Sequence, residues 1–217
     1  MGDEADLIEI RSVQVGRPSV LATTAAGDDV WSAIVKAPVT APTLTLSTIN
    51  LDGDDQADRT VHGGPDKAVY VYSADHFDAW SAELDRPVGA GWFGENVTVA
   101  GVTELDAAIG DRWAWGDALL EICQPRWPCY KLTMRAGIRD IGHRMKTTAR
   151  TGWYLRVIEP GVVPTSGEIT VVSRHPATVA VADAHAAMYD RHREDPALIA
   201  RVAAVPELSE EWRGPLG

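Results

Sequence analysis

The stretch IGDRWAWGDALLEICQPRWPCYKL, residues 109–132, contains two segments rich in aromatic and branched aliphatic residues, followed by a proline-flanked basic segment and a cysteine. We predict one strand in residues 111–117 and another in residues 118–124, separated by a Gly-Asp turn. Two prolines then bracket Arg126 and Trp127, so the backbone there is predicted to be stiff and extended. This rigidity would present Cys129 at a fixed place just after a strand.

Further short strands are predicted on both sides of this stretch. In residues 7–15, Ile8 and Ile10 alternate with Glu9 and Arg11, which is the period of a strand with one buried face. The other segments with strand-forming composition are residues 30–38, 43–48, 67–73, 96–102, 151–161 and 167–173. Many short strands in close succession favour a barrel or a curled sheet over alternating βαβ units.

Helices are predicted in two places between these strands and again at the end of the chain. Residues 75–85 place Phe77, Trp80 and Leu84 on one helical face, and residues 137–147 form a second helical pattern. After residue 173 the composition becomes rich in alanine, and helices are predicted over residues 175–195, 195–205 and 206–214, the last two starting at Pro196 and Pro206. We therefore divide the chain into a barrel domain, 1–173, and a three-helix tail, 174–217. The tail is too small to hold a core alone, so it should pack on the barrel or on a second subunit.

Composition and charge exclude several classes of protein. The net charge of −11 should repel nucleic acid and anionic lipid, so neither is expected as a partner. Two cysteines rule out a disulfide framework and any four-thiolate cluster. No apolar run is long enough to span a bilayer, and the acidic start of the chain lacks the features of a secretory signal. A cytoplasmic location is therefore expected.

The basic residues are concentrated in one region. Residues 125–156 carry a net charge of +7 in an acidic chain, with Asp140 as the sole acid among them. This segment is either a solvated helix face or a pocket for an anionic ligand.

The two cysteines have different predicted roles. Arg126 and Lys131 flank Cys129 and would favour its thiolate, the form that binds a metal or attacks electrophilic sulfur. The alternative for Cys129 is a small buried hydrophobic residue. Cys123 lies inside a predicted strand, alternating with Leu119 and Glu121, and is expected to pack in the core.

Two glycine turns supply further candidates. In DRTVHGGPDKAV, residues 58–69, the donors Arg59, His62 and Lys67 come from one loop and could bind an anion, although a histidine before Gly-Gly is often only a turn residue. In WFGENVT, residues 92–98, Asn96 could offer a donor and an acceptor to a heterocycle, or it could cap the turn.

Taken together, these motifs resemble the MOSC domain family, named after the C-terminal domain of molybdenum-cofactor sulfurase. The likeness rests on residues 54–72, 91–99, 109–132 and 151–161, in which His-Gly-Gly, Phe-Gly-Glu-Asn and Pro-Arg-Trp-Pro-Cys occur in order. Within the family, the chain is similar to bacterial stand-alone YiiM-type members, which end in a short three-helix tail. The resemblance implies a mainly β, α+β fold: a MOSC-type β-barrel with a few helices and a basic pocket around one essential cysteine, here Cys129.

The resemblance also implies an activity. Related proteins that reduce N-hydroxylated substrates use this cysteine as a ligand of the molybdenum in the molybdenum cofactor (molybdopterin). The implied function is that of a molybdenum-dependent oxidoreductase acting on hydroxylamino-purines or amidoximes, with Cys129 and His62 as catalytic residues. The cofactor-binding residues would be Arg59, Lys67, Asn96, Arg126, Lys131 and Arg150.

Because no flavin or nucleotide motif is visible and two cysteines cannot hold an iron–sulfur cluster, electrons should come from a separate flavin or iron–sulfur reductase. The tail could cover the pocket, contact that reductase or form a homodimer. Two other functions stay open. One is a sulfur carrier with a persulfide on Cys129, and the other is a non-catalytic cofactor-binding module. A cysteine hydrolase is the least favoured alternative.

Overall fold

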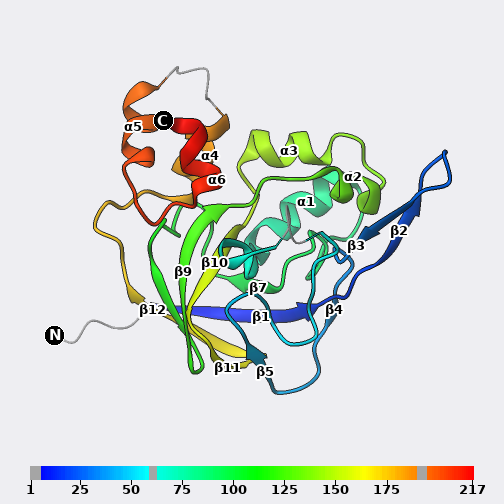
Figure 1. Ribbon diagram of the computed structural model, residues 1–217, viewed down its shortest axis with the longest axis horizontal. Helices are drawn as coiled ribbons and strands as arrows, with labels where there is room; N and C mark the ends of the chain where they lie inside the picture. Colours follow the sequence, from blue (N-terminus) through cyan, green and yellow to red (C-terminus); the bar gives the residue numbers. More distant parts are fainter. Residues whose placement is uncertain (1–5, 59–62, 190–194) are drawn as a thin grey trace.

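The computed structural model describes residues 6–58, 63–189 and 195–217. Its centre is a closed barrel of seven strands, which confirms the predicted α+β barrel (Figure 1). Neighbouring strands are antiparallel except for one parallel pair, β6 and β7. Around the barrel the order is β12 (Gly167–Ser173), β8 (Arg112–Trp115), β9 (Ala118–Pro125), β10 (Trp153–Glu159), β6 (Val69–Ser73), β7 (Val97–Ala100) and β1 (Leu7–Val15), which pairs again with β12.

The barrel encloses a hydrophobic core, and the alternating patterns of the strands predict which residues form it. In β1, Ile8 and Ile10 are buried, whereas Leu7 and Glu9 are exposed, as the alternation predicts. Large side chains fill the interior, and Trp113 and Trp153 meet edge to face with ring centroids 5.9 Å apart. Burying such side chains is the main favourable contribution to folding.

Outside the barrel, short strands differ most from the predictions. The predicted strand at 30–38 is two strands, β3 (Asp29–Ser32) and β4 (Ala37–Pro38), because the residues between them leave the sheet and line a pocket. The strands β2 (Ser19–Thr23) and β11 (Gly161–Pro164) were not predicted. β2 pairs with β3 in a hairpin that extends away from the body (Figure 1), and β11 pairs with β5 (Thr43–Leu46).

Three helices, α1 (Phe77–Leu84), α2 (Tyr130–Ala136) and α3 (Ile141–Thr148), lie together on one side of the barrel (Figure 1). Trp80 is buried and Phe77 and Leu84 pack around it, so the predicted face of α1 is confirmed. α2 was not predicted, and α3 begins four residues later than expected. Gly137 separates these two helices, because its positive φ of 66° ends α2 in a left-handed turn.

The tail contains three helices, as predicted: α4 (Val181–Tyr189), α5 (Pro196–Ala203) and α6 (Glu210–Arg213). The first begins at Val181 instead of residue 175, and part of its predicted end lies outside the described residues. The start of α5 is as expected, since the Asp195 carboxylate accepts a hydrogen bond from the Leu198 N–H. The start predicted at Pro206 is wrong: α6 begins at Glu210, after the cap residue Ser209.

The tail packs on the barrel, as its small size requires. The Ser209 N–H donates to the carbonyl of Cys123 in β9 over 2.9 Å, and the Ile109 N–H donates to the carbonyl of Val179 over 2.8 Å. Apolar side chains of α4, α5 and α6 belong to the same buried cluster as the barrel strands. In the ranges that the structure describes, no helix is long and apolar enough to cross a membrane.

Candidate functional site

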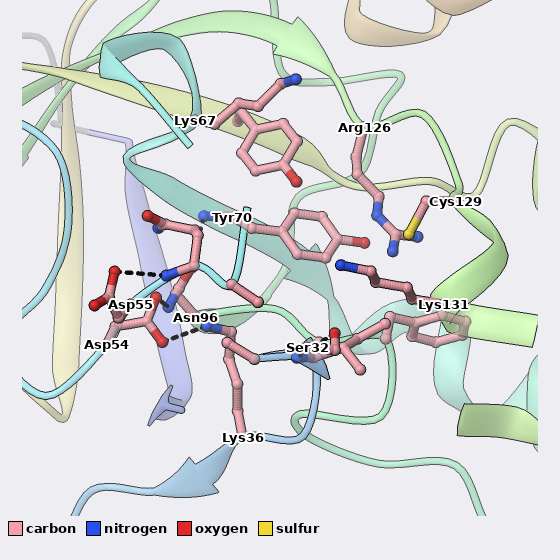
Figure 2. Close-up of a pocket in the computed structure, with 17 residues that line it drawn as sticks. Ser32, Lys36, Asp54, Asp55, Lys67, Tyr70, Asn96, Arg126, Cys129 and Lys131 are labelled. Atoms are coloured by element: carbon pink, nitrogen blue, oxygen red, sulfur yellow. Dashed lines mark hydrogen bonds and ion pairs between the residues drawn. The ribbon is translucent and has the colours of Figure 1, made fainter. Parts of the chain in front are cut away.

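A pocket opens where β9 passes into α2, and Cys129 lies in its wall (Figure 2). It contains about 600 Å³ of space, counting the part that is continuous with solvent. Four basic side chains share this wall with the cysteine: Lys36, Lys67, Arg126 and Lys131. We call this site the cationic pocket.

Cys129 is held at the junction between an extended segment and a helix. Its backbone is extended, with φ −105° and ψ 164°, and its carbonyl accepts the Leu132 N–H at the start of α2. The side chain is half-buried, and Cys129 and Cys123 are thiols rather than a disulfide. Cys123 is fully buried, its thiol directed at the carbonyls of Asp66 and Tyr154, and burial raises its pKa. Cys129 is therefore the cysteine that a ligand in the pocket can reach.

Arg126 is the most buried cation of the pocket, with 5% of its surface exposed. Its guanidinium lies over the ring of Tyr70, 5.1 Å from the centroid. Burial lowers the pKa of Arg126, but its interactions with Tyr70, Tyr154 and Cys129 outweigh this effect. The pKa is therefore raised above its ordinary value. Figure 2 shows this guanidinium beside the sulfur of Cys129, with Lys131 extended toward the same part of the pocket. A fixed positive charge therefore adjoins the thiol.

The opposite wall is organised by Asp54. Its carboxylate forms a buried ion pair with Lys36, accepts the Gly16 N–H over 2.8 Å and accepts the amide of Asn96 over 2.9 Å. Burial lowers the pKa of Lys36 despite this pairing. The side-chain oxygen of Asn96, Oδ1, accepts a hydrogen bond from the Tyr70 N–H, so both the donor and the acceptor of its side-chain amide are occupied by the protein. If Asn96 binds a cofactor, one of these bonds must break.

Packing and hydrogen bonding explain the residues of the Phe-Gly-Glu-Asn turn. Gly94 has a φ of 83°, and a Cβ there would lie 2.6 Å from Cγ1 of Ile34, so no other residue fits. The buried Glu95 carboxylate accepts the N–H groups of Gly91 and Phe93, over 2.5 and 3.0 Å. The turn thereby places Asn96 against Asp54.

The predicted site residues do not all meet here. Lys67, Asn96, Arg126, Cys129 and Lys131 line one pocket. Arg150 does not: the left-handed turn at Ala149 places its guanidinium over Trp80, 4.1 Å from the ring, and beside Glu83. Its predicted role is therefore corrected to packing against α1. Arg59 and His62 lie outside the described residues.

Sequence reasoning missed several pocket residues. Tyr70 and Tyr154 come from β6 and β10, and the Tyr70 hydroxyl donates to the carbonyl of Thr151 over 2.8 Å. Burial raises the pKa of Tyr154 to about 12, although Arg126 counteracts it. The alternation in residues 67–73 already placed Tyr70 and Tyr72 on one face, and this was the available signal. Lys36 and Asp54 lie in segments without a recognisable motif.

A second hollow lies on the other side of Cys129, toward the tail, and we call it the tail-side hollow. It shares Lys67, Cys129 and Tyr154 with the cationic pocket and contains about 660 Å³ of space counted in the same way. Its other lining residues are Gln124, Trp127, Pro128, Tyr130 and Glu211. Among the described residues, no cluster of three or more His, Cys, Asp or Glu side chains could hold a metal. Within the described part of the chain, Cys129 would therefore need further ligands from elsewhere to hold a metal.

Comparisons with known proteins give consistent results along the chain. The MOSC domain model matches residues 58–170, and the YiiM-like, 3-alpha helix domain model matches residues 179–216. The uncharacterized protein YflK of Bacillus subtilis is 37% identical over 204 residues, which is 94% of this chain and 90% of YflK. The crystal structure of YiiM from Geobacillus stearothermophilus superposes with a TM-score of 0.80 at 31% identity, covering 96% of this chain and 97% of YiiM. A protein of Gibberella moniliformis named Reductase is 34% identical over 154 residues, 69% of this chain and 27% of that protein.

Proposed function

Since this chain belongs to the MOSC domain family, we propose that it binds the molybdenum cofactor in the cationic pocket and reduces N-hydroxylated compounds there. Cys129 is the proposed protein ligand of molybdenum. One observation carries the proposal: a half-buried thiol shares a pocket with Lys36, Lys67, Arg126 and Lys131, although the chain as a whole is strongly acidic. The relative named Reductase supports a reductive reaction.

The donor set of the pocket fits such a cofactor. A pterin cofactor carries a phosphate, and its metal centre is an anionic oxo-thiolate unit, so both ends seek positive charge. Arg126 and Lys131 supply that charge beside the thiol, and Lys67, paired with Glu211, lies on another part of the wall. Molybdenum is soft enough to accept a thiolate ligand, and Cys129 can supply one. When bound, the cofactor supplies a two-electron redox centre.

The chain's own residues have three tasks in this proposal. Cys129 would hold the metal of the bound cofactor through its thiolate. Arg126 keeps its charge because its neighbours raise its pKa, so it neutralises an anionic group without taking part in proton transfer. Tyr154 keeps its phenolic proton at neutral pH, because its pKa is about 12, and it remains a hydrogen-bond donor in the wall. The predicted proton donor His62 stays a prediction.

Electrons must be delivered from outside the chain in this proposal. Two cysteines are too few for a four-thiolate iron–sulfur cluster, and one of them, Cys123, is sealed in the barrel. A separate flavin or iron–sulfur reductase is therefore the proposed partner, with a small N-hydroxylated molecule as the substrate.

The test is to isolate the full-length protein from cells that make the cofactor and to measure bound molybdenum and pterin. The wild type should retain both and should reduce an N-hydroxylated purine when an artificial electron donor is supplied. Cys129→Ala should lose activity. Cys123→Ser should keep it, because a serine hydroxyl can donate to the same two carbonyls.

The alternative functions give different results in the same experiment. A sulfur carrier would hold no metal and would show a mass gain of one sulfur atom on Cys129. A storage module would hold the metal without reducing the substrate. Equal loss of activity in the two cysteine variants would mean that Cys129 is not the special thiol.

A further inference from the structure

The two hollows that meet at Cys129 differ in charge. The cationic pocket is lined by Lys36, Arg126 and Lys131, none of which lines the tail-side hollow, and these cations together with Lys67 outnumber its carboxylates, Asp54 and Asp55. In the described lining of the tail-side hollow the one cation is Lys67, which it shares with the cationic pocket, and the tail adds a carboxylate, that of Glu211. An anionic cofactor would therefore favour one side of the thiol and leave the other side accessible.

Lys67 and Glu211 form an ion pair across the boundary between barrel and tail. The Lys67 Nζ lies 2.5 Å from Oε2 of Glu211. The Lys67 side chain is only 13% exposed, whereas that of Glu211 is 54% exposed. The pair offsets the charge of Lys67, and the carboxylate is the member that an entering molecule meets first.

The remaining lining of the tail-side hollow is suited to flat molecules that donate hydrogen bonds. Tyr130 is well exposed and Tyr154 forms the wall shared with the cationic pocket, so aromatic surface faces the hollow. Gln124 also lines it, and its side-chain oxygen is buried with no hydrogen-bond partner among the described residues. A buried acceptor of this kind is costly unless a donor reaches it.

We propose that the tail-side hollow is the substrate subsite and that Glu211 is its specificity-determining residue. This inference rests on the proposed function. The subsite takes planar N-hydroxylated compounds that keep an N–H donor, and the amidines and aminated heterocycles formed from them, in their neutral or cationic forms. The Glu211 carboxylate attracts the N–H groups, and it disfavours molecules that carry a carboxylate of their own. The tail thus contributes directly to substrate choice.

The inference is tested with two probes of the same shape, benzamidine, which is cationic, and benzamide, which is neutral. Binding to the isotope-labelled full-length protein is followed by NMR through the side-chain amide of Gln124 and the indole N–H of Trp127. Both resonances should shift. The ratio of benzamidine to benzamide affinity should fall about fivefold in Glu211→Gln, as removal of a partly exposed charge implies. It should rise in Lys67→Gln, which leaves Glu211 unpaired.

Glu210→Gln is the matched control, because Glu210 is the preceding residue of α6 and pairs with Arg213 instead. It should leave the ratio unchanged. An equal ratio in the wild type, Glu211→Gln and Lys67→Gln would overturn the inference, as would probe-induced shifts confined to other parts of the chain. The probes need no cofactor, so a failure of cofactor binding would leave this ratio intact. An unchanged ratio in a protein that retains molybdenum would overturn this inference and leave the proposed function standing.

Discussion

The indole ring of Trp127 packs edge-on against that of Trp212, with centroids 5.6 Å apart and planes at 71°. Trp127 lies two residues before Cys129, and Trp212 lies in α6 of the tail. The Nζ of Lys146, from α3, lies 4.3 Å from the Trp127 ring centroid. The segment that presents the thiol is thus braced by the tail and by a barrel-side helix together.

Loss of this brace should destabilise the protein. Trp212→Ala removes a buried aromatic side chain, so the free energy of unfolding should fall by about 3–5 kcal/mol, measured by denaturant titration. Trp31→Ala is the control, since Trp31 is 52% exposed on the β2–β3 hairpin, and it should cost less than about 1 kcal/mol. Equal losses in the two variants would show that Trp212 does not join the tail to the barrel.

Anion binding should distinguish two arginines that sequence analysis treats alike. Arg126→Met removes the buried charge of the cationic pocket and should weaken inorganic phosphate binding about tenfold or more in calorimetric titration. Arg150→Met should leave phosphate affinity unchanged, because Arg150 is held by Glu83 and Trp80 outside the pocket. Phosphate affinity that falls in Arg150→Met and persists in Arg126→Met would reverse the assignment.

This pair of arginines also shows how far the sequence can predict the site. Arg126 and Cys129 are close along the chain, and the prolines fix the backbone between them, so their proximity is a local property. Arg150 reaches or misses the pocket according to the direction in which the chain leaves α3. That direction is set by Ala149, which has a positive φ. Alanine rarely adopts this conformation, so the sequence does not predict it.

The fold shows the same division between local and long-range information. Strands that build the barrel, such as β1 and β9, carry alternating or continuous apolar residues and were predicted well. α2 was missed because its sequence, YKLTMRA, is short and follows directly on a proline-rich extended segment. Lys36 precedes β4 and Asp54 follows β5, so their contact depends on how separate segments pack together.

The stability of the tail interface should depend on pH through His185. This side chain contacts Trp127, Tyr189 and Trp212, and its Nε2 has no hydrogen-bond partner in the described part of the chain. Burial lowers its pKa from 6.5 to about 4. The unfolded chain takes up a proton below pH 6.5, whereas the folded chain does so only near pH 4, so stability falls as the pH is lowered between these values.

The expected loss approaches about 3 kcal/mol at the acid end of that range, since each pH unit contributes about 1.4 kcal/mol. Urea unfolding of the wild type and His185→Gln at several pH values measures it. The difference in free energy of unfolding between the two proteins should change little near pH 7 and steadily once the pH falls below about 6.5. A difference that is constant with pH would show that His185 is not the titrating group.

The wall opposite the thiol should depend on Asp54. Asp54→Asn leaves the buried ammonium of Lys36 without its counter-charge, so the free energy of unfolding should fall by about 3–5 kcal/mol. Asp52→Asn, two residues earlier and exposed, should change it by less than about 0.5 kcal/mol. The double variant Asp54→Asn with Lys36→Met should recover part of the loss, because no unpaired charge then remains buried. Absence of any recovery would indicate that the ion pair is not the source of the effect.

The central claim is that the sulfur of Cys129 ligates molybdenum in a cationic pocket. Molybdenum K-edge X-ray absorption on the wild type and Cys129→Ser, both isolated from cofactor-producing cells, tests it directly. We predict one more sulfur ligand on the metal in the wild type than in the variant. The same sulfur coordination in both proteins, or a wild type without molybdenum, would contradict the claim.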